Sequence, residues 1–102
     1  MFQQQQSIIE NAWQNRALLN TSEVQDCVHN IIELLDKGKL RVATPQDDGS
    51  WKVNDWVKKA VIMYFPIAKM ETIKVGPFEF HDKIPLKKNY ADLGVRVVPH
   101  GI

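Results

Sequence analysis

The side chains that could bind a metal or act as nucleophiles are few and scattered. His29 falls on the flank of a predicted helix, whereas His81 stands beside Asp82 in a distant part of the chain, so they do not suggest a metal pair. We expect both histidines to lie on the surface. Cys27 is the only cysteine, which excludes an intrachain disulfide and leaves a structural zinc site without its usual thiolates. Its place in an apolar stripe predicts a buried, unreactive thiol.

Two residues near the end of the chain, Arg96 and His100, could contribute polar chemistry together. In an extended chain they would share one side, roughly 13 Å apart at about 3.3 Å per residue. Pro99 breaks that regularity, so we expect His100 to be a solvated residue of the tail. From its position in the sequence alone, we would expect Arg96 to be an exposed strand residue that forms an ion pair with a nearby acidic side chain.

Composition limits the class of protein. The chain has 102 residues, of which 44% are hydrophobic and 25% charged, as in one compact soluble domain. A net charge of +1 argues against nucleic acid as a partner. The most apolar stretch, residues 60–68, is too short to span a bilayer, and the first residues lack the features of a signal peptide. We therefore expect a cytoplasmic protein with no membrane partner.

Two helices are predicted in the first part of the chain. Apolar residues at helical spacing indicate a first helix over about residues 3–19. Ser22 and Gln25 have the capping-box spacing, so the second helix should begin at Ser22. Gly38 stands where a left-handed residue would end it.

A small hairpin and a third helix should follow. Residues 40–44 and 51–53 are short strand-like runs on either side of a turn-rich segment, residues 46–50. Asn54 can cap the next helix, with Asp55 in its first turn, and Pro66 should end it near Phe65. Such an apolar helix is either central or docks against something else.

Several conspicuous side chains around this junction have ordinary structural explanations. Trp51 and Trp56 should close the core between hairpin and helix, although one of them could form part of a subunit contact. Arg41 and the pair Lys58 and Lys59 should be solvated charges, and a role in contacting phosphate has no support.

The last part of the chain is the least regular. Residues 72–75 are a possible strand, Gly76-Pro77 indicates a turn, and residues 78–80 are a further alternating fragment. Residues 94–98 form a β-prone run. A terminal strand with no successor implies a partner elsewhere, so we expect the chain to be cut short. We also expect it to be mobile beyond about Gly94. The predicted fold class is α+β, mainly helical, with about three helices and a hairpin between the second and third.

Two segments resemble a known family. Residues 35–67, LDKGKLRVATPQDDGSWKVNDWVKKAVIMYFPI, and residues 94–99, GVRVVP, are similar to the amino-terminal domain of the tetrahydrodipicolinate N-succinyltransferase family. The opening QQQQSIIENAWQNRA and the segment HDKIPLK fit the same family, so the resemblance covers nearly the whole of residues 1–102. Two positions depart from it: Pro66 replaces a common Arg, and His100 replaces a frequent second Pro.

The resemblance implies the role of this chain in an acyltransferase of lysine and diaminopimelate biosynthesis. Residues 1–102 would be the amino-terminal domain of a homotrimer, and their last strand would lead to an absent left-handed β-helix, along which succinyl-CoA binds as co-substrate. The acceptor is a small dicarboxylate with an amine, and Arg96 matches the family's substrate-binding arginine. A guanidinium suits a carboxylate because it donates two parallel charged hydrogen bonds. No catalytic, cofactor-binding or metal-binding residue is expected here, so this fragment alone should be inactive.

One alternative stays open. The chain could be a free-standing helical interaction module, without catalysis, that uses its apolar third helix and its terminal strand to bind a partner. The sequence leaves open why the chain ends at Ile102, the oligomeric state of the fragment, the identity of the general base and oxyanion donors, and whether Arg96 is ordered without the β-helix.

Overall fold

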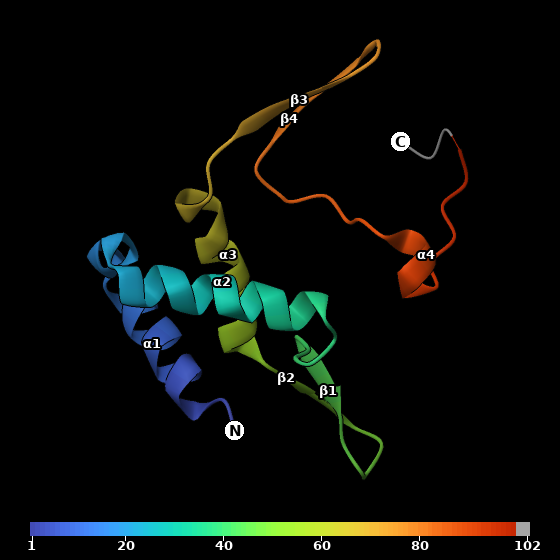
Figure 1. Ribbon diagram of the computed structural model, residues 1–102. Helices are drawn as coiled ribbons and strands as arrows, with labels where there is room; N and C mark the ends of the chain where they lie inside the picture. The colour runs from blue at the N-terminus through green and yellow to red at the C-terminus, as the bar shows by residue number, and fades with distance from the viewer. Residues whose placement is uncertain (100–102) are drawn as a thin grey trace. The chain divides into compact units, whose positions relative to one another are not determined.

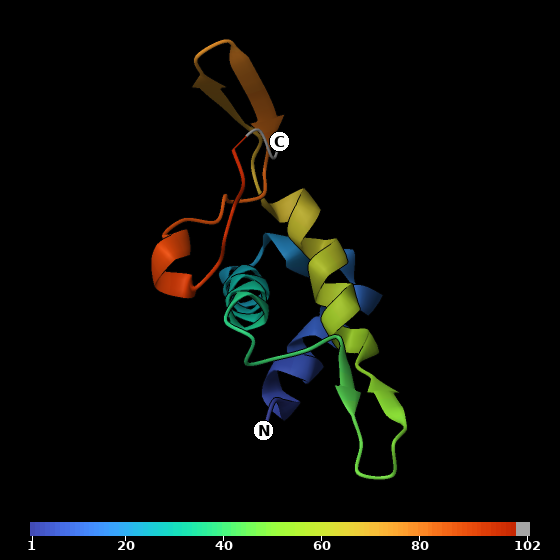
Figure 2. The same cartoon turned by 90° about the vertical axis from the view of Figure 1, so that its right-hand side faces the viewer.

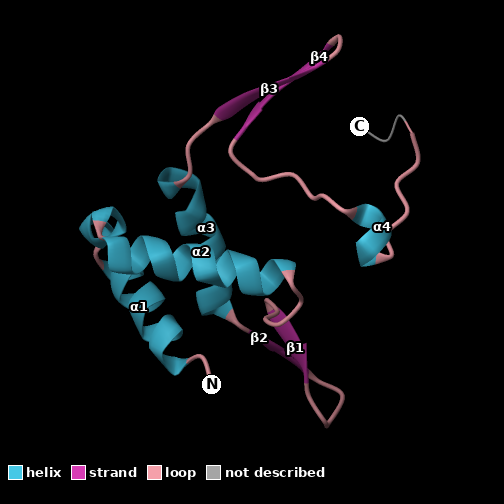
Figure 3. Cartoon of the chain, in the orientation of Figure 1, coloured by secondary structure: helices cyan, strands magenta, loops and turns pink. Residues whose placement is uncertain are grey.

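The computed structural model describes residues 1–99, which form an α+β fold that is mainly helical (Figures 1 and 3). The chain divides into two compact units, Met1–Lys69 and Met70–Ile102. The first unit contains α1 (Gln3–Gln14), a 3₁₀ helix (Arg16–Asn20), α2 (Ser22–Asp36), β1 (Ala43–Pro45), β2 (Trp51–Val53) and α3 (Asp55–Ile67). The second contains β3 (Glu71–Val75), β4 (Phe78–Asp82) and the single turn α4 (Tyr90–Leu93). None of the helices within residues 1–99 has the length and apolar composition that crossing a membrane requires.

The core of the first unit lies between its three α-helices, each of which contacts the other two. Figure 2 views α2 along its axis, with α1 and α3 beside it. The buried side chains come mainly from one face of each helix, as their periodicity predicts. They are Ile9, Ala12, Val24, Cys27, Val28, Ile31, Leu40, Trp56, Val57, Ala60, Met63 and Tyr64.

The first helix is shorter than the predicted span of residues 3–19. It ends at Gln14, Asn15 is extended, and a 3₁₀ helix completes the segment. Local polar groups favour this break, because the Arg16 Nε donates to the Trp13 carbonyl and the Thr21 Oγ1 donates to the Leu18 carbonyl. These side chains satisfy carbonyl groups that a continuing α-helix would have paired with backbone N–H groups.

Both ends of α2 show defined caps. The residue that caps its start is Thr21, whose Oγ1 accepts from the Val24 N–H at 3.4 Å, and not Ser22 as the capping-box spacing predicted. At the other end Gly38 has φ +72° and donates to the Leu35 carbonyl, while Lys39 donates to the Leu34 carbonyl. This pair of bonds is a Schellman motif, which confirms the predicted role of Gly38.

The predicted hairpin is confirmed, with Ala43 opposite Val53 and Pro45 opposite Trp51. Its turn is held by Asp48, whose Oδ1 accepts from the backbone N–H and the hydroxyl of Ser50. These two hydrogen bonds stabilise the charged carboxylate and lower the pKa of Asp48.

Asn54 joins the hairpin to α3. Its Nδ2 donates to the Arg41 carbonyl at 2.8 Å and to the Thr44 Oγ1 at 3.0 Å, and its backbone N–H donates to the Val42 carbonyl at 2.7 Å. Asn54 occupies the predicted N-cap position, but its side chain makes no capping bond and is used to hold the hairpin. The base of the hairpin therefore depends on this one amide.

The third helix passes through Pro66 and ends at Ile67, so the prediction that Pro66 would end it near Phe65 is wrong. Proline has no N–H, and the Ile62 carbonyl loses its usual partner there. The Ala68 N–H still donates to the Tyr64 carbonyl at 2.9 Å, which closes the last turn beyond the proline. Helix α3 packs against both α1 and α2, while Ile62 and Phe65 each remain 42% exposed.

In the second unit the possible strand at residues 72–75 is confirmed as part of β3. It pairs with β4, which contains the alternating fragment 78–80, so that Val75 lies opposite Phe78 across the Gly76-Pro77 turn. The single turn α4 was not predicted. Residues 95–98 form no strand, which contradicts the predicted terminal strand. A β-prone run becomes a strand only when another backbone edge accepts its hydrogen bonds, and within residues 1–99 no such edge pairs with it.

We predict that Asn54→Ala destabilises the first unit by about 1–2 kcal/mol, since it removes two side-chain hydrogen bonds at the hairpin base. The unfolding midpoint in urea, followed by circular dichroism, measures the loss. Exposed Asn30 on α2 provides the matched control, because Asn30→Ala should change stability by no more than about 0.5 kcal/mol. Equal stability of the two variants would contradict the role assigned to Asn54.

Candidate functional site

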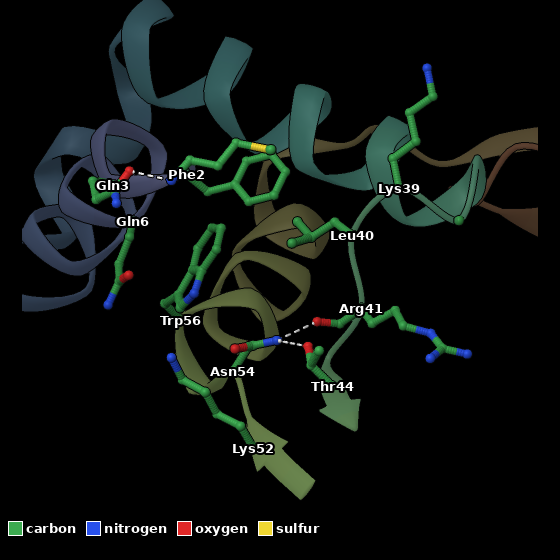
Figure 4. Close-up of a pocket in the computed structure, with 12 residues that line it drawn as sticks. Phe2, Gln3, Gln6, Lys39, Leu40, Arg41, Thr44, Lys52, Asn54 and Trp56 are labelled. Atoms are coloured by element: carbon green, nitrogen blue, oxygen red, sulfur yellow. Dashed lines mark hydrogen bonds between the residues drawn. The ribbon is translucent and has the colours of Figure 1, made fainter. Parts of the chain in front are cut away.

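The first unit contains a cleft of about 400 Å³ between the start of α1, the loop after α2 and the hairpin. Figure 4 shows Trp56 at one side of it, with the Asn54 amide bonded to Arg41 and Thr44. The cleft exists because strand alternation turns Thr44 and Lys52 toward it and Trp51 to the opposite face.

The cleft is lined by positively charged side chains, but these side chains do not converge on one point. Lys39, Arg41 and Lys52 line it, and no carboxylate is among its lining residues within the described chain. In Figure 4 the Lys39 and Arg41 side chains extend away from Trp56. An active site needs polar groups directed at one point, so this cleft does not supply one.

Arg96, the predicted substrate-binding residue, lies in the second unit. It follows Gly94, which has φ +69° and caps α4, and the Val95 N–H donates to the Tyr90 carbonyl at 2.9 Å. The Arg96 side chain is exposed, and within residues 1–99 its guanidinium has neither an ion pair nor a hydrogen bond. The expectation that it simply pairs with a nearby acid is therefore not met in this part of the chain.

The histidines do not form a site. His29 is exposed on α2 with its ring edge-on to Tyr64 at 6.0 Å, and the His81 Nδ1 lies 2.9 Å from the Thr72 Oγ1 in the second hairpin. Both are surface residues, as predicted. Residues 1–99 contain no cluster of three or more His, Cys, Asp or Glu side chains that could hold a metal. The third candidate, His100, lies outside the described residues.

Cys27 is buried in the core, as predicted, and its Sγ lies 3.8 Å from the Gln5 carbonyl. Burial raises the pKa of the Cys27 thiol, and the charge of Glu23 raises it further. A raised pKa reduces the thiolate fraction at neutral pH. The thiol therefore has neither the access nor the ionisation that a nucleophile needs.

The two tryptophans at the hairpin differ from the prediction that both close the core. Trp56 is 8% exposed and belongs to the core, whereas Trp51 is 62% exposed. All three residues of β2 are exposed, Trp51 and Val53 included, because the hairpin lies outside the helical core, whereas Trp56 lies on the buried face of α3.

A third tryptophan carries a contact that was not predicted. The Arg16 Cζ lies 4.2 Å from the Trp13 ring centroid, and the Lys59 Nζ lies 5.7 Å from it. Lys59 is thus half-buried rather than freely solvated, while Lys58 and Arg41 are exposed as predicted. Spacing along the chain could have indicated the Arg16 contact, but Lys59 reaches Trp13 only through tertiary packing.

Comparison with known proteins identifies relatives of the chain. Residues 4–67 match the family described as tetrahydrodipicolinate N-succinyltransferase N-terminal. The chain is 46% identical to the 2,3,4,5-tetrahydropyridine-2,6-dicarboxylate N-succinyltransferase of Paracidovorax citrulli, over 100% of this chain and 41% of that protein. It is 44% identical to the enzyme of the same name from Agrobacterium fabrum, over 95% of this chain and 38% of that protein. The chain thus spans about two fifths of the length of these relatives.

We predict that the native chain reacts with iodoacetamide at about pH 8 at least about tenfold more slowly than the urea-unfolded chain, because burial and a raised pKa both protect Cys27. Mass spectrometry of alkylated protein over time gives both rates. The unfolded chain serves as the control, since its thiol has the reagent access and ordinary pKa of a free cysteine. Similar rates in the two states would contradict the assignment of Cys27 to the core.

Proposed function

Because the chain belongs to the family of tetrahydrodipicolinate N-succinyltransferase N-terminal domains, we propose that it is the substrate-binding and assembly domain of a longer N-succinyltransferase. The whole enzyme transfers succinyl from succinyl-CoA to the amine of open-chain tetrahydrodipicolinate, in lysine biosynthesis through diaminopimelate. It acts in the cytoplasm as a homotrimer. The names of the relatives support the dicarboxylate acceptor and the N-succinyl transfer.

The proposed reaction is attack of an amine on a thioester. The amine nitrogen forms a bond to the succinyl carbonyl carbon, the carbon–sulfur bond breaks, and coenzyme A leaves as its thiolate while the amine proton passes to a base. We place the succinyl-CoA site, that base and the oxyanion donors outside residues 1–102, which bind no cofactor of their own. Residues 1–99 offer no cluster of three or more His, Cys, Asp or Glu side chains in their place: Cys27 is buried, and His29 and His81 belong to different units.

The exposed guanidinium of Arg96 is the observation that carries the proposal. Within residues 1–99 its donors have no protein acceptor, so they are available to a carboxylate of the acceptor. One charged hydrogen-bonding group supplies about 1–3 kcal/mol, which is too little for tight binding by this chain alone. Arg96 would therefore contribute to a pocket that the rest of the enzyme completes.

We predict that Arg96→Ala in the full-length enzyme raises the KM for the dicarboxylate acceptor about 10- to 100-fold, while the KM for succinyl-CoA stays within about twofold. Arg96→Lys should recover only part of the loss, because an ammonium group lacks the planar fork. Steady-state release of the coenzyme A thiol measures both constants.

Lys88→Ala is the matched control, since Lys88 is an exposed cation of the same unit. It should leave both KM values unchanged. An Arg96→Ala enzyme with unaltered acceptor KM and turnover would refute the role of Arg96. Measurable succinyl transfer by the 102-residue chain alone would refute the placement of the reacting groups elsewhere.

Partial exposure of Ile62 and Phe65 on α3 favours a second function, that of a free-standing interaction module without catalysis. The reading frame after codon 102 distinguishes the two. Continuation into repeats with an aliphatic residue at every sixth position supports the transferase domain, whereas a stop codon supports the module.

A further inference from the structure

The second hairpin is amphipathic. Antiparallel pairing places Ile73 opposite Phe80 and Val75 opposite Phe78, and alternation puts these four side chains on one face. We call Ile73, Val75, Phe78 and Phe80 the apolar hairpin face. The opposite face is polar, with Thr72 opposite His81 and Lys74 opposite Glu79.

Within residues 70–99 of the second unit, no other side chain buries the apolar hairpin face. Val75, Phe78 and Phe80 are 55%, 50% and 40% exposed, and residues 70–99 contain no buried side chain at all. A two-stranded hairpin is marginally stable in water, and a contiguous apolar face needs a cover. The hairpin must therefore gain its stability from a surface that packs on this face.

The length of the relatives indicates which surface that is. The Paracidovorax citrulli relative matches the whole of this chain, yet the match covers only 41% of its length, so most of its polypeptide lies outside these residues. We propose that the apolar hairpin face docks on the remainder of the longer polypeptide. This inference rests on the proposed function, which makes the chain one domain of a larger enzyme.

Charge at the edge of the face makes a second copy of the same hairpin a poor occupant. Glu71 and Asp82 lie directly opposite each other at one end of the apolar hairpin face. If two identical hairpins stacked face to face in the same direction, their four carboxylates would come together. If they stacked in opposite directions, the two carboxylates of each would lie on the apolar Val75 and Phe78 end of the other. The complementary surface is an apolar patch bordered by at least one cation.

Docking would also restrict the positions that the Arg96 side chain can reach. The arginine follows β4 along the chain, and a hairpin held on the body of the enzyme limits the volume that Arg96 can reach. The apolar hairpin face thereby acts as a positioning element for the acceptor-binding guanidinium.

Hydrogen exchange of the full-length polypeptide and of the 102-residue chain tests the proposal. The β3 and β4 amides should exchange at least about tenfold more slowly in the longer polypeptide. The double variant Phe78→Ser/Phe80→Ser should remove that protection and raise the acceptor KM without changing the KM for succinyl-CoA. The double variant Lys74→Ser/Glu79→Ser, on the polar face, should do neither and is the matched control.

Equal protection of the β3 and β4 amides in the two polypeptides would overturn the proposal. If the 102-residue chain is then monomeric, its own helices cover the face. If it dimerises with concentration, a second copy covers it. Loss of protection in the polar-face control would overturn it as well. Turnover of the full-length polypeptide separates the two claims: an unprotected hairpin in an active succinyltransferase refutes docking alone, whereas absence of succinyl transfer refutes the proposed function.

Discussion

Burial of one face of α3 is the constraint on which the first unit depends. Val57, Ala60 and Met63 have no exposed surface, and α3 contacts both α1 and α2. The small Ala60 side chain permits close approach of the neighbouring helices, while Met63 fills the irregular space between them. This packing holds the start of α3, and the start of α3 in turn holds the hairpin through the Asn54 amide. The cleft beside Trp56 is a result of the same arrangement.

Elements whose signals are local could be predicted from the sequence. The apolar stripe and Gly38 define α2, and the turn residues define both hairpins, because periodicity and a left-handed glycine act within a few residues. The end of α1 could not be predicted, since it is decided by side-chain hydrogen bonds of Arg16 and Thr21 that compete with the helix. The exposure of Trp51 could not be predicted, since it depends on the tertiary placement of the hairpin outside the helical core.

The terminal segment shows a different limit. Residues 95–98 have the composition of a strand, but composition supplies no partner edge, and none is present within residues 1–99. For the candidate site the sequence indicates one residue, Arg96, only through the motif around it, and its role stays a prediction. The structure adds that its guanidinium is exposed and without a protein acceptor in the described chain. The unpaired segment, the open guanidinium and the uncovered hairpin all belong to the unit that lacks a core of its own.

The contrast between Trp51 and Trp56 gives the protein two built-in optical reporters. The Trp56 indole is shielded in the core and should emit at shorter wavelength, while the Trp51 indole is in water and open to collisional quenching by iodide. Because they stand at the two ends of the hairpin-to-helix junction, a variant in which Trp13 and one of these two are replaced has a single tryptophan. Its emission reports either the interior of the helical unit or the outer face of its hairpin. Loosening of the hairpin could thus be observed in solution separately from melting of the core.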